Sequence, residues 1–195
     1  MSKIKYPRYK ALAVAEELVE ALRPCCTRVE IAGSIRRGRP QVGDVEIVYV
    51  PSFAPGERVD MFAPPEPVNM AEAMIQGWVS SHVIRQRLNV EEHPTWGLKN
   101  KLAVHESSGI PVDLFSTTED AWFNYLVCRT GGAENNTVIA AMAKSKGWKW
   151  NPYAEGFSRV DWDGKETGEK SPRMDSEEAV FAFVSLRYLT PSERR

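Results

Sequence analysis

The sequence predicts an α+β protein, with a mixed or antiparallel sheet in its first part and a small α/β subdomain in its C-terminal third. Strand-like segments predominate up to residue 116, and helical spacing predominates after residue 118. The segment that joins the first two strand-like stretches is too short for a βαβ crossover, which favours an antiparallel pair. We therefore expect two domains, over residues 1–117 and 118–195.

The first predicted helix runs from Arg8 to Arg23 between two breakers, Pro7 and Pro24. Its apolar residues recur at helical spacing, at Ala11, Val14, Ala15, Leu18, Val19 and Leu22. Two strands should follow: "RVEIAGS", which ends at Gly33, and "GDVEIVYV", which is rich in β-branched residues.

The middle of the chain has an irregular, proline-rich segment, then a helical pattern and then strand-like patterns. Residues 51–67 contain five prolines and show no hydrophobic periodicity, so we expect an irregular surface loop there. Helical spacing returns in "NMAEAMIQGWV". The segments "HVIRQRLNV", "GLKNKLAVH" and "IPVDLFS" then alternate as strands do.

Capping residues and helix stops predict three helices in the C-terminal third of the chain. The first begins at about Thr118, a capping residue, and ends near Gly131. The second runs from about Glu134 to Lys146, with Gly147 as its stop. A polar stretch over 151–173 follows, and the last helix begins at a Ser-Glu-Glu capping pattern.

Composition excludes several classes of protein. The net charge is -1, so the chain lacks the excess of basic residues that is typical of strongly basic nucleic-acid-binding proteins. It also has no run of about 18 apolar residues, which a membrane-spanning helix would need. The polar N-terminus indicates neither a signal nor a transit peptide, so we expect a cytoplasmic protein with no membrane partner. An odd number of cysteines, three, of which Cys25 and Cys26 are adjacent, makes a poor disulfide framework, so we expect all three thiols to be reduced.

Three acidic residues are candidates for a metal site. Asp44 and Glu46 lie two residues apart and so share one face of a strand, where they could hold a cation or simply face water. Asp113 lies between apolar neighbours in a later strand, and a buried acid needs a partner or a metal. Carboxylates on neighbouring strands are ligands that Mg²⁺ accepts together with water and phosphate.

The segment "GSIRRG" precedes Asp44 and Glu46 by about ten positions. In "GSIRRG", Gly33 allows a close backbone approach, Ser34 offers a hydroxyl, and Arg37 offers a forked donor suited to phosphate. The combination is typical of a site that binds a metal-bound nucleoside triphosphate. The alternative is a charged sheet edge held together by salt bridges.

"GSIRRG", "GDVE" and "VDLF", in this order, resemble the nucleotidyltransferase fold of DNA polymerase β. The segments "RTGGAENNTVIAAMAKSKGWKWNPYAEG" and "DSEEAVFAFVSLRYLTPSERR" resemble the fingers-type subdomain and the closing segment of X-family polymerases. The resemblance implies a catalytic palm over 1–117 and a fingers-type, nucleotide-selecting subdomain over 118–195, in a minimal form without the family's N-terminal helix-hairpin-helix domain.

What the resemblance implies is DNA-directed addition of dNMP to a primer 3′-hydroxyl, in short-gap or end repair, with two Mg²⁺ ions that Mn²⁺ can replace. The catalytic and metal-binding residues would be Asp44, Glu46 and Asp113. The nucleotide-binding residues would be Gly33, Ser34, Arg37, Gly43, Thr130, Gly131 and Asn136. The chain departs from the family by Glu46 in place of an aspartate, and by Cys128 and Arg129 in place of aromatic residues.

The implied partners are a nucleoside triphosphate, primer-template or gapped DNA, and a DNA-anchoring protein; a viral source would place the chain in the host cytoplasm. The expected DNA contacts are Lys99, Lys101, Lys144, Lys146 and Lys149. Alternating Trp148 and Trp150 are expected to pack a core rather than to stack on bases. Two alternatives stay open: a template-independent, RNA or small-molecule nucleotidyltransferase, and a non-catalytic module that binds DNA ends or a protein.

Overall fold

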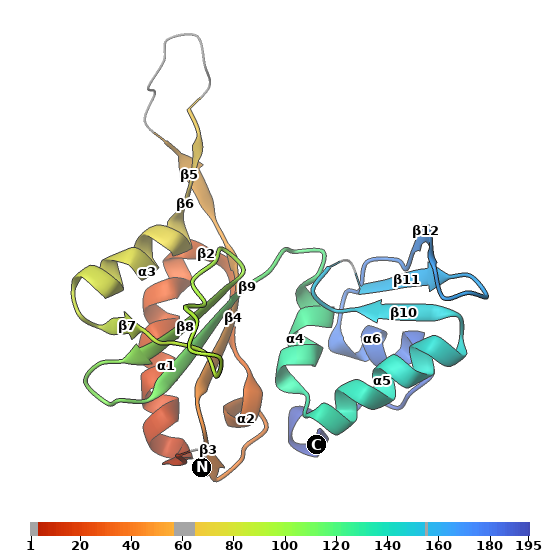
Figure 1. The fold of residues 1–195 in the computed structure, drawn as a ribbon, viewed down its shortest axis with the longest axis horizontal. Helices are drawn as coiled ribbons and strands as arrows, with labels where there is room; N and C mark the ends of the chain where they lie inside the picture. Colours follow the sequence, from red (N-terminus) through yellow and green to blue (C-terminus); the bar gives the residue numbers. More distant parts are fainter. Residues whose placement is uncertain (1–3, 57–64, 155) are drawn as a thin grey trace. The chain divides into compact units, whose positions relative to one another are not determined.

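The computed structural model describes residues 4–56, 65–154 and 156–195 (Figure 1). The chain divides into two compact units. The first comprises Met1–Ile31 and Gln41–Ser116, and the second comprises Ala32–Pro40 and Thr117–Arg195. The division after Ser116 lies one residue from the expected boundary. The segment 32–40, which we expected in the first domain, groups with the second unit.

A mixed sheet forms the centre of the first unit. Among the described residues it has five strands in the order β2-β4-β9-β8-β7. Their bounds are β2 (Cys26–Ile31), β4 (Val45–Pro51), β9 (Pro111–Ser116), β8 (Asn100–His105) and β7 (Ile84–Gln86). The pair β2 and β4 is antiparallel, as predicted, whereas β4 and β9 are parallel. The α+β fold class with a mixed sheet is therefore confirmed.

Two helices complete this unit: α1 (Arg8–Leu22) and α3 (Met70–Ser80). The helix α1 packs on β2 and β4 and also contacts α3. Its buried residues are the six at the predicted helical spacing, namely Ala11, Val14, Ala15, Leu18, Val19 and Leu22. The helix α3 begins where the side chain of Asn69 accepts a hydrogen bond of 3.0 Å from the backbone N–H of Glu72.

Short strands connect these larger elements. The strand β1 (Tyr6–Pro7) pairs with β3 (Gln41–Val42), and a 3₁₀ turn, η1 (Arg23–Cys25), links α1 to β2. The strand β5 (Phe53–Pro55) pairs with β6 (Pro67–Asn69) inside the region that we expected to be irregular. Residues 57–64 of that expected loop lie outside the described residues.

The second unit contains four helices and a three-stranded antiparallel sheet among its described residues. The helices are α2 (Gly33–Arg36), α4 (Trp122–Thr130), α5 (Ala133–Ser145) and α6 (Glu177–Phe183), and a 3₁₀ turn, η2 (Pro191–Glu193), lies near the end of the chain. The strands are β10 (Trp148–Asn151), β11 (Gly156–Val160) and β12 (Glu166–Lys170).

Two details differ from the sequence prediction or add to it. The expected strand "RVEIAGS" ends at Ile31, and Gly33 instead opens α2 with a φ of 60°. The polar stretch over 151–173 contains the hairpin of β11 and β12. Every residue of β12 is exposed, so this strand has no alternation of apolar and polar residues by which to recognise it.

The core of the second unit lies between α4, α5, α6 and the sheet. It is built on Val127, Ile139, Ala143, Phe157, Met174, Val180, Phe181 and Val184. Trp148 and Trp150 pack against this core, which confirms the predicted packing role. The ring centroids of Trp148 and Phe183 are 5.1 Å apart in an edge-to-face arrangement.

The described part of the chain also gives the character of its helices and the state of its cysteines. None of its helices has the length and apolar character needed to cross a membrane. Cys25, Cys26 and Cys128 are free thiols, as their odd number indicated.

Candidate functional site

The register of two parallel strands brings two of the three predicted carboxylates together. In the pairing of β4 with β9, Glu46 lies opposite Asp113. Side chains of directly paired residues point to the same face of a sheet. Asp44 immediately precedes β4, two residues before Glu46. All three residues are half-buried, between buried neighbours such as Val45 and Val112.

Asp113 already has a cationic partner. The guanidinium group of Arg87 donates a hydrogen bond from Nη2 to Asp113 Oδ1 over 2.5 Å, and the two groups form an ion pair. Arg87 follows β7 and donates its backbone N–H to the carbonyl of Leu102 in β8. Leu102 in turn pairs with Asp113 across the sheet. The sequence reasoning missed Arg87 because nothing in its local pattern marks it as a partner of Asp113.

The donor set suits Mg²⁺ in its chemistry, since it consists of carboxylate oxygens. Within residues 4–56, 65–154 and 156–195, however, no three side chains of the His, Cys, Asp and Glu types are grouped so that they could hold a metal ion. The structure thus brings Glu46 and Asp113 side by side on the sheet without gathering all three acids into one cage. The pairing of Asp113 with Arg87 is the observed feature that opposes such a cage.

In the second unit, the segment "GSIRRG" forms a compact turn. Gly33 and Gly38 both have positive φ, at 60° and 71°, a conformation that favours glycine. The backbone N–H of Arg37 donates to the carbonyl of Gly33 over 3.1 Å, and that of Arg39 donates to the carbonyl of Ser34 over 3.1 Å. These bonds fix the backbone from which Ser34 and Arg37 project.

The predicted nucleotide-binding residues of this unit form one cluster. The Nη1 atom of Arg37 donates to the carbonyl of Thr130 over 2.6 Å. Gly131 follows, and a side chain at this position would collide with the amide of Asn136. Asn136 donates from Nδ2 to the carbonyl of Cys128 over 2.9 Å. The Thr-Gly turn is therefore held against the start of α5 by close packing and hydrogen bonds.

Arg129, next to this turn, lies between two tyrosine rings. Its guanidinium carbon is 5.3 Å from the ring centroid of Tyr125 and 5.0 Å from that of Tyr153. Such distances are typical of cation–π contacts. The residue that departs from the expected aromatic pattern is thus packed within a small aromatic group.

A buried ion-pair network joins the same turn to α6, and sequence reasoning missed it. Arg36 binds both carboxylate oxygens of Glu177, at 2.8 and 2.9 Å, and donates to the hydroxyl of Thr130 over 2.9 Å. Arg194, which is fully buried, donates to Glu177 over 2.9 Å. Burial alone would raise the pKa of Glu177, but the hydrogen bonds from the two arginines outweigh it and lower the pKa.

One expected DNA contact is wrong. The side chain of Lys101 is 1% exposed, and its Nζ atom lies 2.6 Å from Glu72 and donates to the carbonyl of Gly97 over 2.8 Å. A buried lysine of this kind neutralises an internal carboxylate and cannot reach a phosphate. The alternating pattern around it correctly predicted a strand but did not indicate which face was buried.

The other expected DNA contacts are exposed. Lys146 donates to Ser185 over 2.9 Å, and Lys149 pairs with Glu166 at 2.9 Å. Lys99 and Lys144 are exposed as well. A groove of about 340 Å³ is lined by Lys144 and Lys149 together with Trp148 and Trp150. Lysines and aromatic walls therefore meet on one surface of the second unit.

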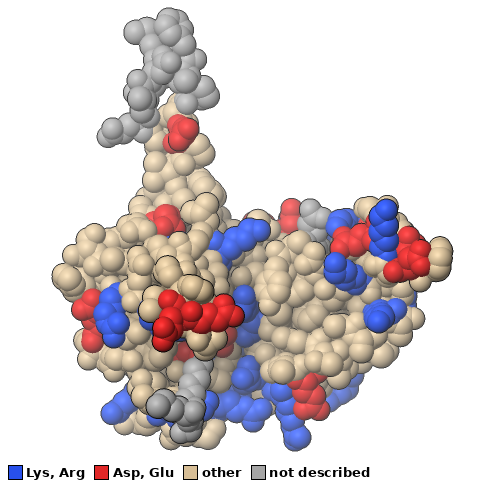
Figure 2. Space-filling view, in the orientation of Figure 1, with Lys and Arg blue, Asp and Glu red and all other residues tan. Residues whose placement is uncertain are grey.

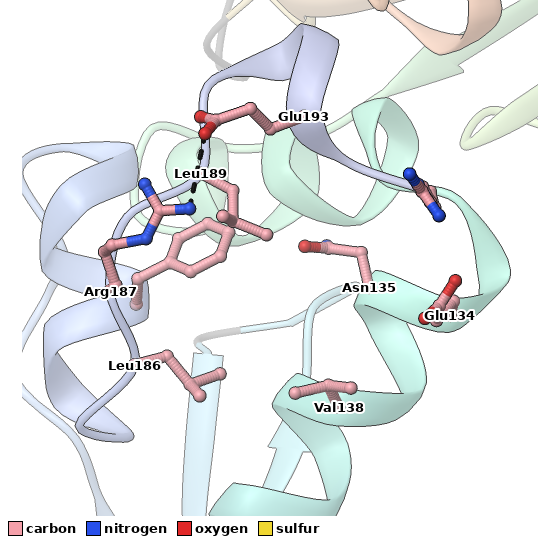
Figure 3. Close-up of a pocket in the computed structure, with 9 residues that line it drawn as sticks. Glu134, Asn135, Val138, Leu186, Arg187, Leu189 and Glu193 are labelled. Atoms are coloured by element: carbon pink, nitrogen blue, oxygen red, sulfur yellow. Dashed lines mark hydrogen bonds and ion pairs between the residues drawn. The ribbon is translucent and has the colours of Figure 1, made fainter.

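Charged residues of both signs lie on the surface of the second unit. On the face that Figure 2 shows, Lys and Arg side chains alternate with acidic ones around the sheet of β10 to β12. A second cavity of about 290 Å³, drawn in Figure 3, lies between α5, α6 and the segment that follows α6. Its walls include Val138, Leu186 and Leu189, and none of the predicted site residues lines it.

Comparison with known proteins relates the C-terminal part to one family. Residues 112–195 match the family model described as DNA polymerase beta thumb. The match begins inside β9 and includes Asp113, the Thr-Gly turn, Glu177 and Arg194. The comparison with curated proteins finds no match for the chain. The matched part is thus similar to the thumb of DNA polymerase beta, and it contains residues 118–195, which we expected to form a fingers-type subdomain.

Proposed function

We propose that this protein is a nucleotidyltransferase of the DNA polymerase X type, which adds dNMP to the 3′-hydroxyl of a primer in gapped or end-containing DNA. The observation that carries the proposal is the pairing of β4 with β9, which sets Glu46 beside Asp113. The thumb match over residues 112–195 supports a polymerase rather than a nucleotidyltransferase that modifies small molecules.

Three carboxylates would form the reaction centre. Asp44, Glu46 and Asp113 would hold divalent cations, with Asp113 free of Arg87 in the active state. When bound, such ions neutralise phosphate charge and lower the pKa of the primer hydroxyl. Asp113 would accept the proton from this hydroxyl as the new phosphodiester bond forms and pyrophosphate leaves.

The second unit would hold the nucleotide. Ser34 and Arg37 would bind the oxygens of the leaving pyrophosphate. Arg37 has five N–H donors, so its bond to the carbonyl of Thr130 can persist while it binds phosphate. Thr130, Gly131 and Asn136 would contact the sugar and base. Positioning and electrostatic stabilisation would account for most of the rate acceleration.

A primer-extension assay tests this proposal. Gapped duplex, open template-primer and single-stranded DNA are each offered dNTPs or NTPs with Mg²⁺ or Mn²⁺. We expect template-matched filling of the gap. Asp113→Asn should abolish incorporation while its circular dichroism spectrum at the assay temperature stays close to that of the wild type; its melting temperature should fall, because Arg87 loses its counter-ion. Incorporation by this variant at the wild-type rate would exclude the proposed role of Asp113.

The ion pair between Arg87 and Asp113 favours a second candidate, a non-catalytic module that binds DNA ends. In that case the carboxylates would serve only the salt bridges of the sheet. The same assay separates the two functions, because such a module would bind gapped DNA in an anisotropy titration and leave every primer unextended. Extension of the single strand alone would indicate a template-independent enzyme.

A further inference from the structure

Arg87 occupies a position that no catalytic scheme for the three carboxylates requires. Its ion pair with Asp113 at 2.5 Å is largely shielded, with side-chain exposures of 24% for Arg87 and 15% for Asp113. The pair lies on the sheet directly beside Glu46, because Asp113 and Glu46 are register partners. A charge-assisted hydrogen bond between a guanidinium and a carboxylate is roughly twice as strong as one between neutral groups.

The rest of the Arg87 side chain is less well satisfied. Its Nε atom is buried and has no hydrogen-bond partner among the described residues. Its Nη1 atom approaches the carbonyl of the next residue, Leu88, only at 3.5 Å. A buried donor without an acceptor costs free energy that is regained when the group reaches water. The bound position of Arg87 is therefore stabilised mainly by the carboxylate of Asp113.

From these contacts we infer that Arg87 is a built-in counter-ion that competes with divalent cations for Asp113. The inference rests on the proposed function, since it concerns the same carboxylates. Arg87 neutralises Asp113 while no metal ion is bound, and it moves toward solvent when an ion takes its place. A divalent ion carries twice the charge of a guanidinium and binds carboxylate oxygens directly, so it can displace the arginine at sufficient concentration.

The consequence is that a higher concentration of divalent ions is needed to occupy the site. The apparent affinity of a site that is available for only a fraction of the time is reduced by that fraction. The competition would keep Asp113 neutralised without ions, and metal binding would turn the side chain of Arg87 away from this carboxylate. The backbone N–H of Arg87 can stay bonded to the carbonyl of Leu102 in β8 meanwhile, so the strand pairs from β7 to β9 need not change.

The test compares two arginine variants of the full chain. Arg87→Met keeps an unbranched side chain about as long as the aliphatic part of arginine and removes the charge. Arg85→Met is the matched control, because Arg85 lies in β7 and is exposed. Calorimetric titration with Mn²⁺ alone, without nucleotide or DNA, measures the affinity. We expect about tenfold tighter binding by Arg87→Met, as loss of a partly shielded competing ion pair predicts, and unchanged binding by Arg85→Met.

A second measurement uses the wild-type chain and so does not depend on how well a variant folds. The Nε–H signal of Arg87 is identified in a ¹H–¹⁵N spectrum by its loss in Arg87→Met. On addition of Mg²⁺ we expect this signal to shift and its proton to exchange faster with water, while the signal of Arg85 stays in place.

The outcomes separate the inference from the proposed function. Equal Mn²⁺ affinities for all three proteins, or weaker binding by Arg87→Met, overturn the role of Arg87 and leave the metal site standing. An Arg87 signal that is unchanged at saturating Mg²⁺ also overturns it. Absence of Mn²⁺ binding in every protein overturns both the counter-ion role and the metal-dependent function.

Discussion

Glu177 shows how much one buried side chain contributes to the second unit. Its carboxylate accepts hydrogen bonds from Arg36 and Arg194, and the residue is only 7% exposed. Removing one partner of a buried ion pair leaves the others without compensation, which is far more costly than losing an exposed pair. The turn that carries the predicted phosphate-binding residues is therefore fixed to α6 by this carboxylate.

We expect Glu177→Gln to lower the free energy of unfolding at pH 7 by about 3 to 5 kcal/mol. Folding lowers the pKa of Glu177 from its ordinary value near 4.5, so its contribution is complete above that pH and is lost as the pH falls through the lower pKa of the folded state. Thermal unfolding between pH 7 and pH 3 measures both effects. Glu178→Gln, at the exposed neighbouring position, is the control and should change stability little.

At the scale of elements, the junction of α4 and α5 depends on close packing rather than on unusual backbone angles. Gly131 has an ordinary φ of -64°, which any residue can adopt. A Cβ atom there would, however, lie 2.6 Å from the amide nitrogen of Asn135 and 3.1 Å from the carbonyl of Val127. The absent side chain is what allows α5 to begin against the end of α4.

Gly131→Ala should therefore destabilise the second unit by about 1 to 3 kcal/mol through overpacking. Gly77→Ala is a contrasting variant, because Gly77 is exposed in α3 and a Cβ atom there meets nothing within 4 Å. It should stabilise the first unit by roughly 0.5 to 1 kcal/mol, since alanine favours a helix. Thermal unfolding of both variants measures the difference; a stabilising Gly131→Ala would contradict the packing argument.

At the scale of the whole molecule, the proposed binding of DNA must depend on a modest number of exposed lysines and arginines, since the net charge is -1. Lys144 and Lys149 line a groove with two tryptophans, whereas Lys101 is buried against Glu72. Contacts with phosphate release counter-ions, so the proposed DNA binding should weaken steeply with salt.

Lys144→Met should lower the slope of log K against log salt by about 0.9 on gapped DNA, as expected for one lost phosphate contact. Lys101→Met should leave this slope unchanged and reduce the melting temperature instead, because it removes the partner of Glu72. Anisotropy titrations at several KCl concentrations measure the slopes. Equal loss of slope in both variants would show that Lys101 reaches DNA after all.

The sequence by itself determined the features that depend on local periodicity. The buried face of α1, the antiparallel pairing of β2 with β4, the capped start of α6 at Ser176 and the packing of Trp148 followed from spacing and capping patterns. These features are local because side-chain direction repeats along a helix or strand.

Tertiary structure alone decided which distant residues meet. The register of β4 and β9 placed Glu46 beside Asp113. The position of β7 brought Arg87 to the carboxylate of Asp113. Burial of Lys101 and the pairing of Arg36 with Glu177 were also settled in this way, because an ion pair leaves no periodic signal in the chain. The sequence gives the charge of each residue, whereas the packing of the elements determines which residue is its partner in an ion pair.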